Sequence, residues 1–599
     1  MKIILAAFAG ALQMLAGGPE IIFLTWAILL ALWVQQLCQR AALLWRFPLI
    51  VVLVIALSTV QLLPFLDLVA HSQRDAGYAD LRWSMPGWGW VNFLVPMAFG
   101  GTWNAGVFFQ YGQSWTSSYY LGIGTLWLAP LAFWVGRDSV ESKSKVRLLS
   151  IIAIVGLVFA LGENTPVLPA VRKLIPQLSF ITYPIKYVLL VVFVAPLLAA
   201  FALARFSSLA PPKQGDGLSK KILISKLLAI GIILLALIVG ILFWAWRFPF
   251  PGDDVPRTLL NGFSRAGFLI ATGALLGMLA RKTSSSLIRI VPLLLVLVAW
   301  LDVFTHEPTQ NPTVQPWIYE SGLSRTKLAL QPQPELGGSR IMVSPAAANE
   351  FVHFATGNPQ NNFLAKRIGY CADVNNLDAV PKVDGFFSLT PRESDDVLAL
   401  FYRTTNASFP HLEEFLGVSQ ITAPGELFQW QARTNYLPLV TAGQKPVFIA
   451  DASMESHLTS PDFDGRKVVF LPEQYRSLLT VSNQTKVKIL GCKFHTQSVD
   501  AAVDAAETSL VVVAQTYYHN WQAEIDGRPV LLLRANHAFQ AVVVPRGQHQ
   551  IHLFYQDRAF QIGAAISIAM WINCLAGLLL FWLRPDPAAK PVFQTDTII

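Results

Sequence analysis

Long apolar runs separated by short polar loops dominate the first half of the chain. A helix needs about 20 mostly apolar residues to cross about 30 Å of hydrocarbon. Ten segments approach this length: 3–17, 20–38, 48–64, 118–136, 147–162, 186–204, 224–245, 264–280, 287–304 and 560–582. They predict a polytopic α-helical transmembrane domain over residues 1–305, a C-terminal transmembrane helix at 559–583 and a tail at 584–599. The first segment also fits a signal peptide, with Lys2 before the apolar run.

Two of the loops between these segments are long and face the same side. Residues 65–117 contain "PGWGWVNFLVP", which is too short and too broken to cross a membrane. It predicts an interfacial or re-entrant segment. In residues 163–185 proline recurs, and proline prevents a long helix.

Residues 306–558 are polar and change character along their length. Residues 306–464 mix helical and strand-like spacing, whereas short strands dominate 465–558. Asp526-Gly527 and Arg546-Gly547 stand between strand-like runs and predict hairpin turns. Strands at this spacing indicate a β-sandwich-like module. The predicted fold is therefore a polytopic helical membrane protein of about ten spans with an α+β domain that ends in this module.

Composition supports a membrane location. The 599 residues are 53% hydrophobic and 14% charged, with a mean hydropathy of +0.46, whereas soluble domains carry about 25% charged residues. The net charge of +8 comes mostly from loops between apolar runs, which argues against nucleic acid as a partner. No CxxC or Cys/His ligand spacing occurs, so no metal site is predicted. A disulfide between Cys371 and Cys492 stays open if their region is extracytoplasmic.

Lys and Arg predict the orientation, since cytoplasmic loops carry an excess of them. One alternating set of loops holds sixteen Lys and Arg, and the other set holds eight. The richer set comprises the loops around 39–47, 137–147, 205–226 and 281–289 and the tail from 584. Both termini are therefore predicted to be cytoplasmic, and residues 306–558 extracytoplasmic.

The apolar segments lack ionisable residues near their centres, which argues against a proton- or ion-coupled transporter. Charged side chains gather instead in the predicted outer loops. Lys186 follows "FITYP" and opens a long apolar segment, which places an ammonium group at headgroup depth. It is the candidate for binding a lipid phosphate, although lysines at such positions also simply snorkel. The other outer-face candidates are Asp67, Arg74, Asp75, Glu163 and Tyr183.

Aromatic residues of the last strands offer a second candidate site. Tyr518 and Trp521 could stack against an acceptor glycan, or they could belong to the sandwich core. Several histidines, including His519, His549 and His552, occur nearby. His549 and His552 are three positions apart, so on a strand they face opposite sides and are unsuited to share a metal ion.

Residues 517–556, "YYHNWQAEIDGRPVLLLRANHAFQAVVVPRGQHQIHLFYQ", resemble the C-terminal signature of the YfhO-type bacterial membrane proteins. "LQMLAGGPE" (12–20), "QLLPFLDLVAHSQR" (61–74), "ITYPIKY" (181–187) and "NPTVQP" (311–316) agree with the same family. His519-Asn520 and Gly18 depart from its pattern.

The resemblance implies a fold similar to GT-C glycosyltransferases and a polyprenyl-phosphate sugar donor. It further implies spans and an acidic outer loop ahead of the segment matched at residue 12, so we expect the chain to be N-terminally short. No catalytic residue can be carried over, and whether a divalent metal cofactor is needed stays open. The expected function is transfer of a sugar from the lipid carrier to a cell-envelope acceptor, or an inactive truncated form of that enzyme. The alternative is a non-catalytic membrane protein whose outer domain binds glycan or a partner protein.

Overall fold

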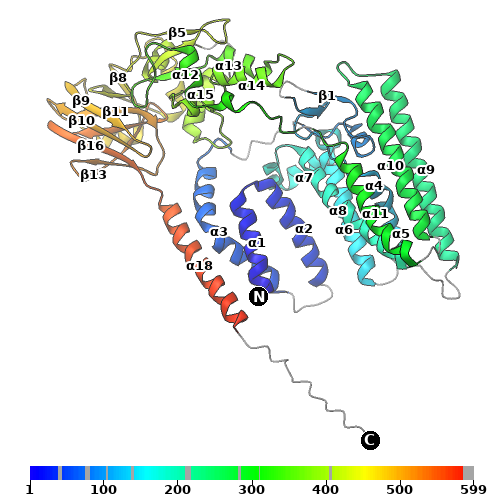
Figure 1. Ribbon diagram of the computed structural model, residues 1–599. Helices are drawn as coiled ribbons and strands as arrows, with labels where there is room; N and C mark the ends of the chain where they lie inside the picture. The colour runs from blue at the N-terminus through cyan, green and yellow to red at the C-terminus, as the bar shows by residue number, and fades with distance from the viewer. Residues whose placement is uncertain are drawn as a thin grey trace.

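A computed structural model describes residues 1–37, 44–74, 81, 83–102, 106–135, 140–208, 217–280, 285–308, 310–403 and 408–583. The described chain has a helical part and a β-rich domain (residues 310–556) that lies above one end of the helices in Figure 1. We call this end of the helices the domain-side end. Asp75 and the tail 584–599 lie outside the described residues.

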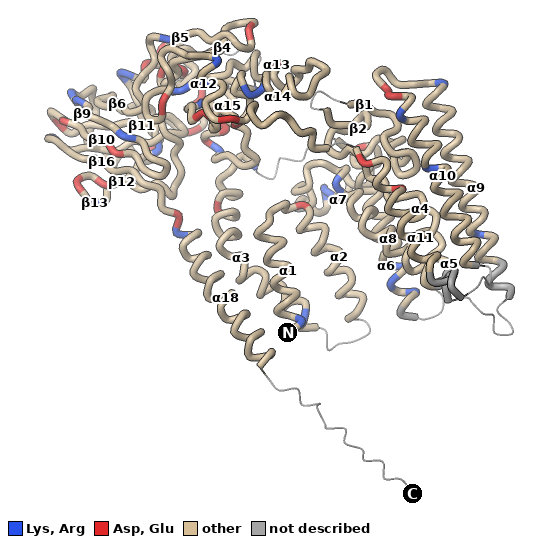
Figure 2. The backbone as a smooth tube through the Cα atoms, viewed as in Figure 1, with Lys and Arg blue, Asp and Glu red and all other residues tan. Residues whose placement is uncertain are grey.

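The helical part contains apolar helices from both ends of the chain. They are α1 (Lys2–Ala16), α2 (Pro19–Leu37), α3 (Arg46–Ala70), α4 (Ile123–Leu128), α5 (Ala132–Val135), α6 (Val140–Ala160), α7 (Val167–Leu174), α8 (Val188–Ser208), α9 (Gly217–Arg247), α10 (Val255–Ala280), α11 (Ser285–Phe304) and α18 (Arg558–Trp582). Charged residues are rare along these helices and concentrate at their ends and over the β-rich domain (Figure 2).

Six helices within the described residues are long and apolar enough to cross a membrane. They are Pro19–Leu37, Arg46–Ala70, Pro184–Ala204, Ile222–Arg247, Val255–Leu279 and Arg558–Trp582. Shorter apolar helices lie at Lys2–Ala16, Ile123–Trp134 and Ile290–Phe304. Membrane helices are thus confirmed, six of them by length and composition, whereas the number of about ten spans stays a prediction.

The helices form two groups. In one, buried residues of α1, α3 and α18 pack together, including Ala7, Leu57 and Cys574. In the other, α4–α6 and α8–α11 share a larger core. Helix α2 contacts both groups, because Trp26 packs against the first core and the Gln35 amide donates to the backbone carbonyl of Ser144 in α6 at 2.6 Å.

Helices α3 and α18 approach each other closely. Gly563 of α18 faces Thr59, and a Cβ built on this glycine would lie 2.5 Å from the Thr59 carbonyl oxygen. One turn further on, the Ser567 hydroxyl accepts a hydrogen bond from Val60 N at 3.0 Å. Trp571 Nε1 donates to the Leu57 carbonyl at 3.1 Å. Small residues and interhelical hydrogen bonds of this kind hold membrane helices together.

The loop between α3 and α4 folds back among the helices. It contains a short 3₁₀ helix, Gly89–Phe93, and the hairpin of β1 (Gly100–Thr102) and β2 (Phe108–Gln110). Val91, Leu94 and Val95 are buried in the core of the larger helix group. The predicted interfacial segment is therefore packed against protein.

The β-rich domain contains several sheets and short helices. Its helices are α12 (Leu323–Leu328), α13 (Pro345–His353), α14 (Pro359–Ile368), α15 (Arg392–Tyr402), α16 (Pro410–Phe415) and α17 (Met454–Leu458). Its strands are β3 (Arg340–Met342), β4 (Val418–Thr422), β5 (Trp430–Ala432), β6 (Val440–Ala442), β7 (Lys445–Ile449), β8 (Val468–Pro472), β9 (Val487–Phe494), β10 (Ser498–Ala505), β11 (Ser509–Thr516), β12 (Trp521–Ile525), β13 (Arg528–Val530), β14 (Leu533–Ala535), β15 (Phe539–Val544) and β16 (Gly547–Tyr555).

Two of these sheets form a sandwich. One has the strand order β13-β12-β16-β10-β9 and the other β14-β15-β11-β6. Every second residue of β10 is buried, as a half-buried strand requires. Val499, Val503, Val511 and Val542 belong to the core between the sheets. The other face of the β11 sheet packs against the mixed region, and β6 shows that the sandwich takes one strand from before residue 465.

The two predicted turns have different outcomes. Asp526 and Gly527 have positive φ and join β12 to β13 as an antiparallel hairpin, as predicted. The hairpin predicted at Arg546-Gly547 is wrong, because β15 and β16 belong to different sheets. This turn carries the chain from one layer of the sandwich to the other. Cys371 and Cys492 are both free thiols, so the disulfide left open by the sequence is absent.

Candidate functional site

A lysine enclosed by aromatic rings lies at the domain-side end of the helices. We call this group the Lys186 cage: Lys186, Glu20, Trp83, Trp115 and Tyr183. Lys186 Nζ lies 2.6 Å from Glu20 Oε1. The same nitrogen lies 4.3 Å from the ring centroid of Trp115 and 5.1 Å from that of Tyr183. The ammonium group therefore combines an ion pair with two cation–π contacts.

Loops from three parts of the chain position this cage. Pro184 begins the short 3₁₀ helix Pro184–Tyr187 ahead of α8, which carries Lys186. Ile185 N donates to the carbonyl of Trp83 at 3.3 Å. Gly162 has a φ of +51°, and a Cβ there would lie 2.1 Å from the Ser84 hydroxyl. These loops fit together only because position 162 lacks a side chain.

The aromatic rings of the cage also contact one another. The centroids of Trp115 and Tyr183 are 4.6 Å apart, and those of Trp83 and Tyr183 are 4.8 Å apart. The Lys186 side chain is only 10% exposed, whereas Trp115 is 46% exposed. The cage is thus open on the Trp115 side. A cation, a carboxylate and exposed ring faces suit a ligand that combines an anion with a sugar ring.

The other predicted outer-face residues divide between the cage and a second cluster. Tyr183 belongs to the cage. Glu163 is exposed nearby, and its backbone N–H donates to the Ser84 hydroxyl at 3.1 Å. Arg74 follows α3, and its backbone N–H donates to the Ser72 hydroxyl at 3.2 Å. Asp67 lies with Tyr518 at the junction of helix α3 and the β-rich domain.

This second group, the junction cluster, comprises Asp67, His71, Tyr518 and His519. Asp67 and His71 lie one turn apart at the end of α3, and Tyr518 and His519 lie between β11 and β12. The Tyr518 hydroxyl donates to Asp67 Oδ2 at 2.7 Å, and His519 Nε2 lies 3.1 Å from the same oxygen. Burial, followed by the hydrogen bond to Asp67, raises the pKa of Tyr518, which keeps its hydroxyl a donor.

Trp521, the other glycan candidate, does not belong to the junction cluster. It packs against Tyr555, with ring centroids 5.9 Å apart. It also lines a cavity of about 290 Å³ together with His519, Leu531 and Phe554.

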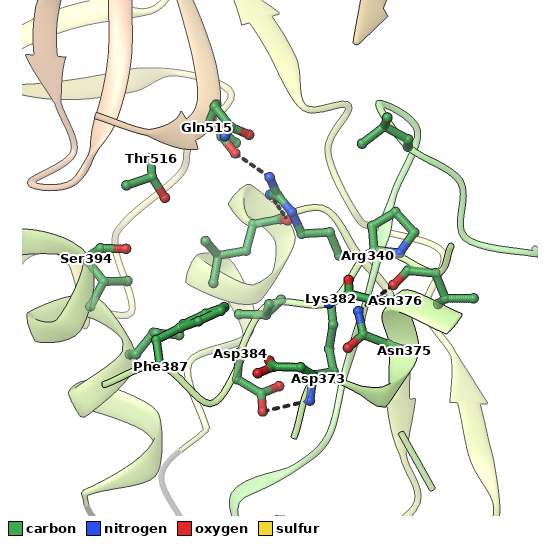
Figure 3. Close-up of a pocket in the computed structure, with 18 of the residues that line it drawn as sticks. Arg340, Asp373, Asn375, Asn376, Lys382, Asp384, Phe387, Ser394, Gln515 and Thr516 are labelled. Carbon is green, nitrogen blue, oxygen red and sulfur yellow. Dashed lines mark hydrogen bonds and ion pairs between the residues drawn. The ribbon is translucent and has the colours of Figure 1, made fainter. Parts of the chain in front are cut away.

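A larger cavity of about 450 Å³ lies within the β-rich domain (Figure 3). Asp373, Asn376 and Asp384 line it with the exposed ring of Phe387. Lys382 also lines the cavity, and its ammonium lies 3.1 Å from Asp384 Oδ2. Carboxylates, amides and an aromatic face are groups that hydrogen-bond and stack against sugars.

Most partners of Lys186 could not be identified from the sequence. Glu20 is 166 residues from Lys186, and its only visible signal was its position at the start of an apolar segment. Trp83 and Trp115 belong to a loop rich in Trp, and their spacing in the sequence does not distinguish them from the other tryptophans of this loop. The imidazoles of His71 and His519 were likewise not linked to Asp67, because nothing in the sequence brings the two segments together.

A buried polar network was also missed. Arg265 of α10 lies 3.0 Å from Asp302 Oδ1 of α11, and both side chains are buried. The Tyr120 hydroxyl donates to Asp302 at 2.8 Å. Burial, followed by the charge of Arg265, lowers the pKa of neighbouring His306 to about 4, so this imidazole is neutral at pH 7. The network joins three elements at the domain-side end, although Arg265 Nε and His306 Nδ1 are buried in it without a hydrogen-bond partner.

Comparison with known proteins gives a family match. Among curated proteins none matches the chain, and none of the solved structures matches it either. The six apolar helices long enough to span a membrane that occur in the described part of the chain agree with a membrane protein. The resemblance seen in the last strands is confirmed, because residues 458–567, from the end of α17 into α18, match the model of the family described as bacterial membrane protein YfhO.

Proposed function

We propose that this protein is a GT-C-like glycosyltransferase of the bacterial cytoplasmic membrane. It transfers a sugar from a polyprenyl-phosphate carrier to a cell-envelope acceptor on the outer face. The observation that carries the proposal is the Lys186 cage, which combines a cation, a carboxylate and aromatic faces where membrane helices end.

The chemistry assigns a role to each charged group. An acceptor hydroxyl attacks the anomeric carbon of the donor sugar, the bond from that carbon to the phosphate oxygen breaks, and polyprenyl phosphate leaves. The phosphate gains one negative charge in this step, and the Lys186 ammonium stabilises it. The Glu20 carboxylate, released from Lys186 as the phosphate binds, takes the proton of the acceptor hydroxyl.

The cavity of the β-rich domain supports a role in acceptor binding. Its carboxylates, amides and the Phe387 ring suit a glycan. The same cavity favours the second candidate function, in which the protein is non-catalytic and its outer domain binds glycan or a partner protein.

The side of the membrane can be tested by fusions. Alkaline phosphatase, which is active only outside the cytoplasm, should be active when fused after residue 310 or 480 and inactive after residue 143 or 215. The reason is the alternating excess of Lys and Arg in the loops. Activity after residue 215 would overturn the proposed orientation.

Donor binding tests the cage. In lipid nanodiscs, Lys186→Ala should weaken binding of a radiolabelled polyprenyl phosphate at least about tenfold, because a charge-assisted contact is lost. Lys186→Arg should retain part of the affinity, since the charge survives. Glu20→Gln should leave binding unchanged or tighter, because it removes the competing carboxylate, but should slow sugar transfer.

Lys226 offers a matched control. Its Nζ also lies over a tryptophan, 4.4 Å from the Trp134 ring centroid, but at the opposite end of the helices. Lys226→Ala should bind polyprenyl phosphate like the parent, and polyprenol without phosphate should distinguish none of the variants. Equal affinity of the parent and Lys186→Ala would make Lys186 a membrane anchor and favour the non-catalytic function.

A further inference from the structure

The junction cluster presents one carboxylate to two imidazoles. Asp67, His71 and His519 each offer one ligand atom, and these atoms all lie within 4.8 Å of one another. His519 Nε2 is 3.1 Å from Asp67 Oδ2, and His71 Nδ1 is 3.5 Å from Asp67 Oδ1. The two imidazole rings lie beside each other, with centroids 4.4 Å apart.

We propose that the junction cluster binds a divalent transition-metal ion of the zinc class, with Asp67, His71 and His519 as ligands. Zinc lies about 2.0–2.2 Å from nitrogen and oxygen ligands in a tetrahedron, so its ligand atoms are about 3.3 Å apart. The nitrogen–oxygen distances of 3.1 Å to Oδ2 and 3.5 Å to Oδ1 of Asp67 are close to this value, although they run to different oxygens of the carboxylate. His71 Nδ1 lies 2.8 Å from the Asp67 backbone carbonyl, so the His71 ring must turn away from that carbonyl for all three ligands to meet one ion.

The surroundings of the three ligands fit this role. Tyr518 donates a hydrogen bond to Asp67 Oδ2 and so orients the carboxylate from outside the ligand set. The His71 and His519 side chains are 53% and 40% exposed. The ion can therefore reach the site from solvent, and water can take the fourth position.

Other histidines of the described β-rich domain are less well placed. Asp500 also lies near two imidazoles, 3.4 Å from His495 Nε2 and 2.7 Å from His552 Nδ1, but among the described residues these ligand atoms do not all lie within 4.8 Å of one another. His549 lies 2.6 Å from Asp526 through Nδ1 and 3.3 Å from the Arg546 carbonyl through Nε2. Asp396, Glu455 and His537 also come together, but with a single imidazole. Among the described groups whose ligand atoms all lie within 4.8 Å of one another, the junction cluster is the one with two nitrogen ligands, the type that zinc prefers.

The ion would join a membrane helix to the β-rich domain. Asp67 and His71 end α3, whereas His519 belongs to the turn from β11 to β12. The neighbouring contacts across this junction are hydrogen bonds, such as Arg392 N to the His71 carbonyl at 2.9 Å. A ligand that binds only the docked arrangement stabilises it. The inference is independent of the proposed transfer reaction, since the cage is a separate group of residues.

Metal content of the full-length chain tests the inference. The protein in detergent is stripped with chelator, dialysed against zinc chloride and analysed by mass spectrometry of the metal. The parent and the control His549→Ala should each hold one more equivalent of zinc than His71→Ala or His519→Ala. The affinity for zinc should be at least about tenfold lower in His71→Ala and His519→Ala than in the parent. Loss of a residue that only hydrogen-bonds to a metal ligand already lowers metal affinity by about tenfold or more.

A second variant separates ligand loss from misfolding. His519→Cys should retain zinc, because a thiolate is also a zinc ligand, and with cobalt in place of zinc it should show a thiolate-to-metal absorption band. Zinc should also raise the melting temperature of the parent and not of His519→Ala. Equal zinc content in the parent and His519→Ala, or a cobalt-loaded His519→Cys without the thiolate band, would overturn the proposal.

Discussion

Replacing Asp378 with alanine should destabilise the β-rich domain by about 3–5 kcal/mol, because it leaves a buried guanidinium unpaired. Arg367 of α14 and Asp378 are both fully buried. Arg367 binds the carboxylate with two nitrogens, at 2.5 and 2.6 Å. Asp378 Oδ1 also accepts a hydrogen bond from Gly322 N at 2.6 Å. Removal of the carboxylate therefore leaves the buried charge of Arg367 without a counterion, and the Ser324 hydroxyl and the Glu320 carbonyl that still accept from it are uncharged.

The measurement is chemical unfolding of the domain followed by tryptophan fluorescence. Glu335→Ala is the control, since Glu335 pairs with Arg325 at 3.4 Å with both side chains exposed. Exposed pairs contribute about 0–1 kcal/mol. Replacing both Arg367 and Asp378 with apolar residues of similar size should recover much of the loss, because no charge then remains buried. A free energy of unfolding for Asp378→Ala within about 1 kcal/mol of the parent would contradict this account.

Gly563→Ile should separate α18 from α3 and lower the stability of the helical part by about 3 kcal/mol, the upper range for overpacking. The added Cβ would lie 2.5 Å from the Thr59 carbonyl oxygen and 3.0 Å from Val60 Cα. Backbone atoms cannot rotate away as a flexible side chain can, so the helices must move apart. The hydrogen bonds of Ser567 and Trp571 to α3 would lengthen with them.

Thermal unfolding in detergent measures this effect. Ala565→Leu is the matched control, because Ala565 is exposed on the same helix and a larger apolar side chain there meets no neighbour in the helix pair. Gly563→Ala should lie between the parent and Gly563→Ile. A melting temperature of Gly563→Ile equal to that of Ala565→Leu would show that the close approach does not support the fold.

The sequence was sufficient for features that depend on local pattern. Apolar runs of about 20 residues predicted the membrane helices, because a chain in lipid must satisfy its backbone hydrogen bonds within each helix. The Asp526-Gly527 hairpin was predictable because both residues tolerate the positive φ that a two-residue turn needs. Alternating burial along β10 follows from the two-residue period of a strand.

Features that depend on long-range pairing were decided by the tertiary structure. Arg546-Gly547 has the composition of a hairpin turn, but the strands on either side bury their apolar faces in different sheets. The sandwich takes β6 from before residue 465 because Val440 fills a position in its core.

The candidate site shows the same division. Lys186 could be predicted from a charge at the start of an apolar segment. Its ion pair with Glu20 joins two helices 166 residues apart. His519 meets Asp67 only because α18, packed along α3, carries the β-rich domain to the end of that helix. Local periodicity thus determined which elements form, whereas packing between distant segments decided which charged side chains face one another.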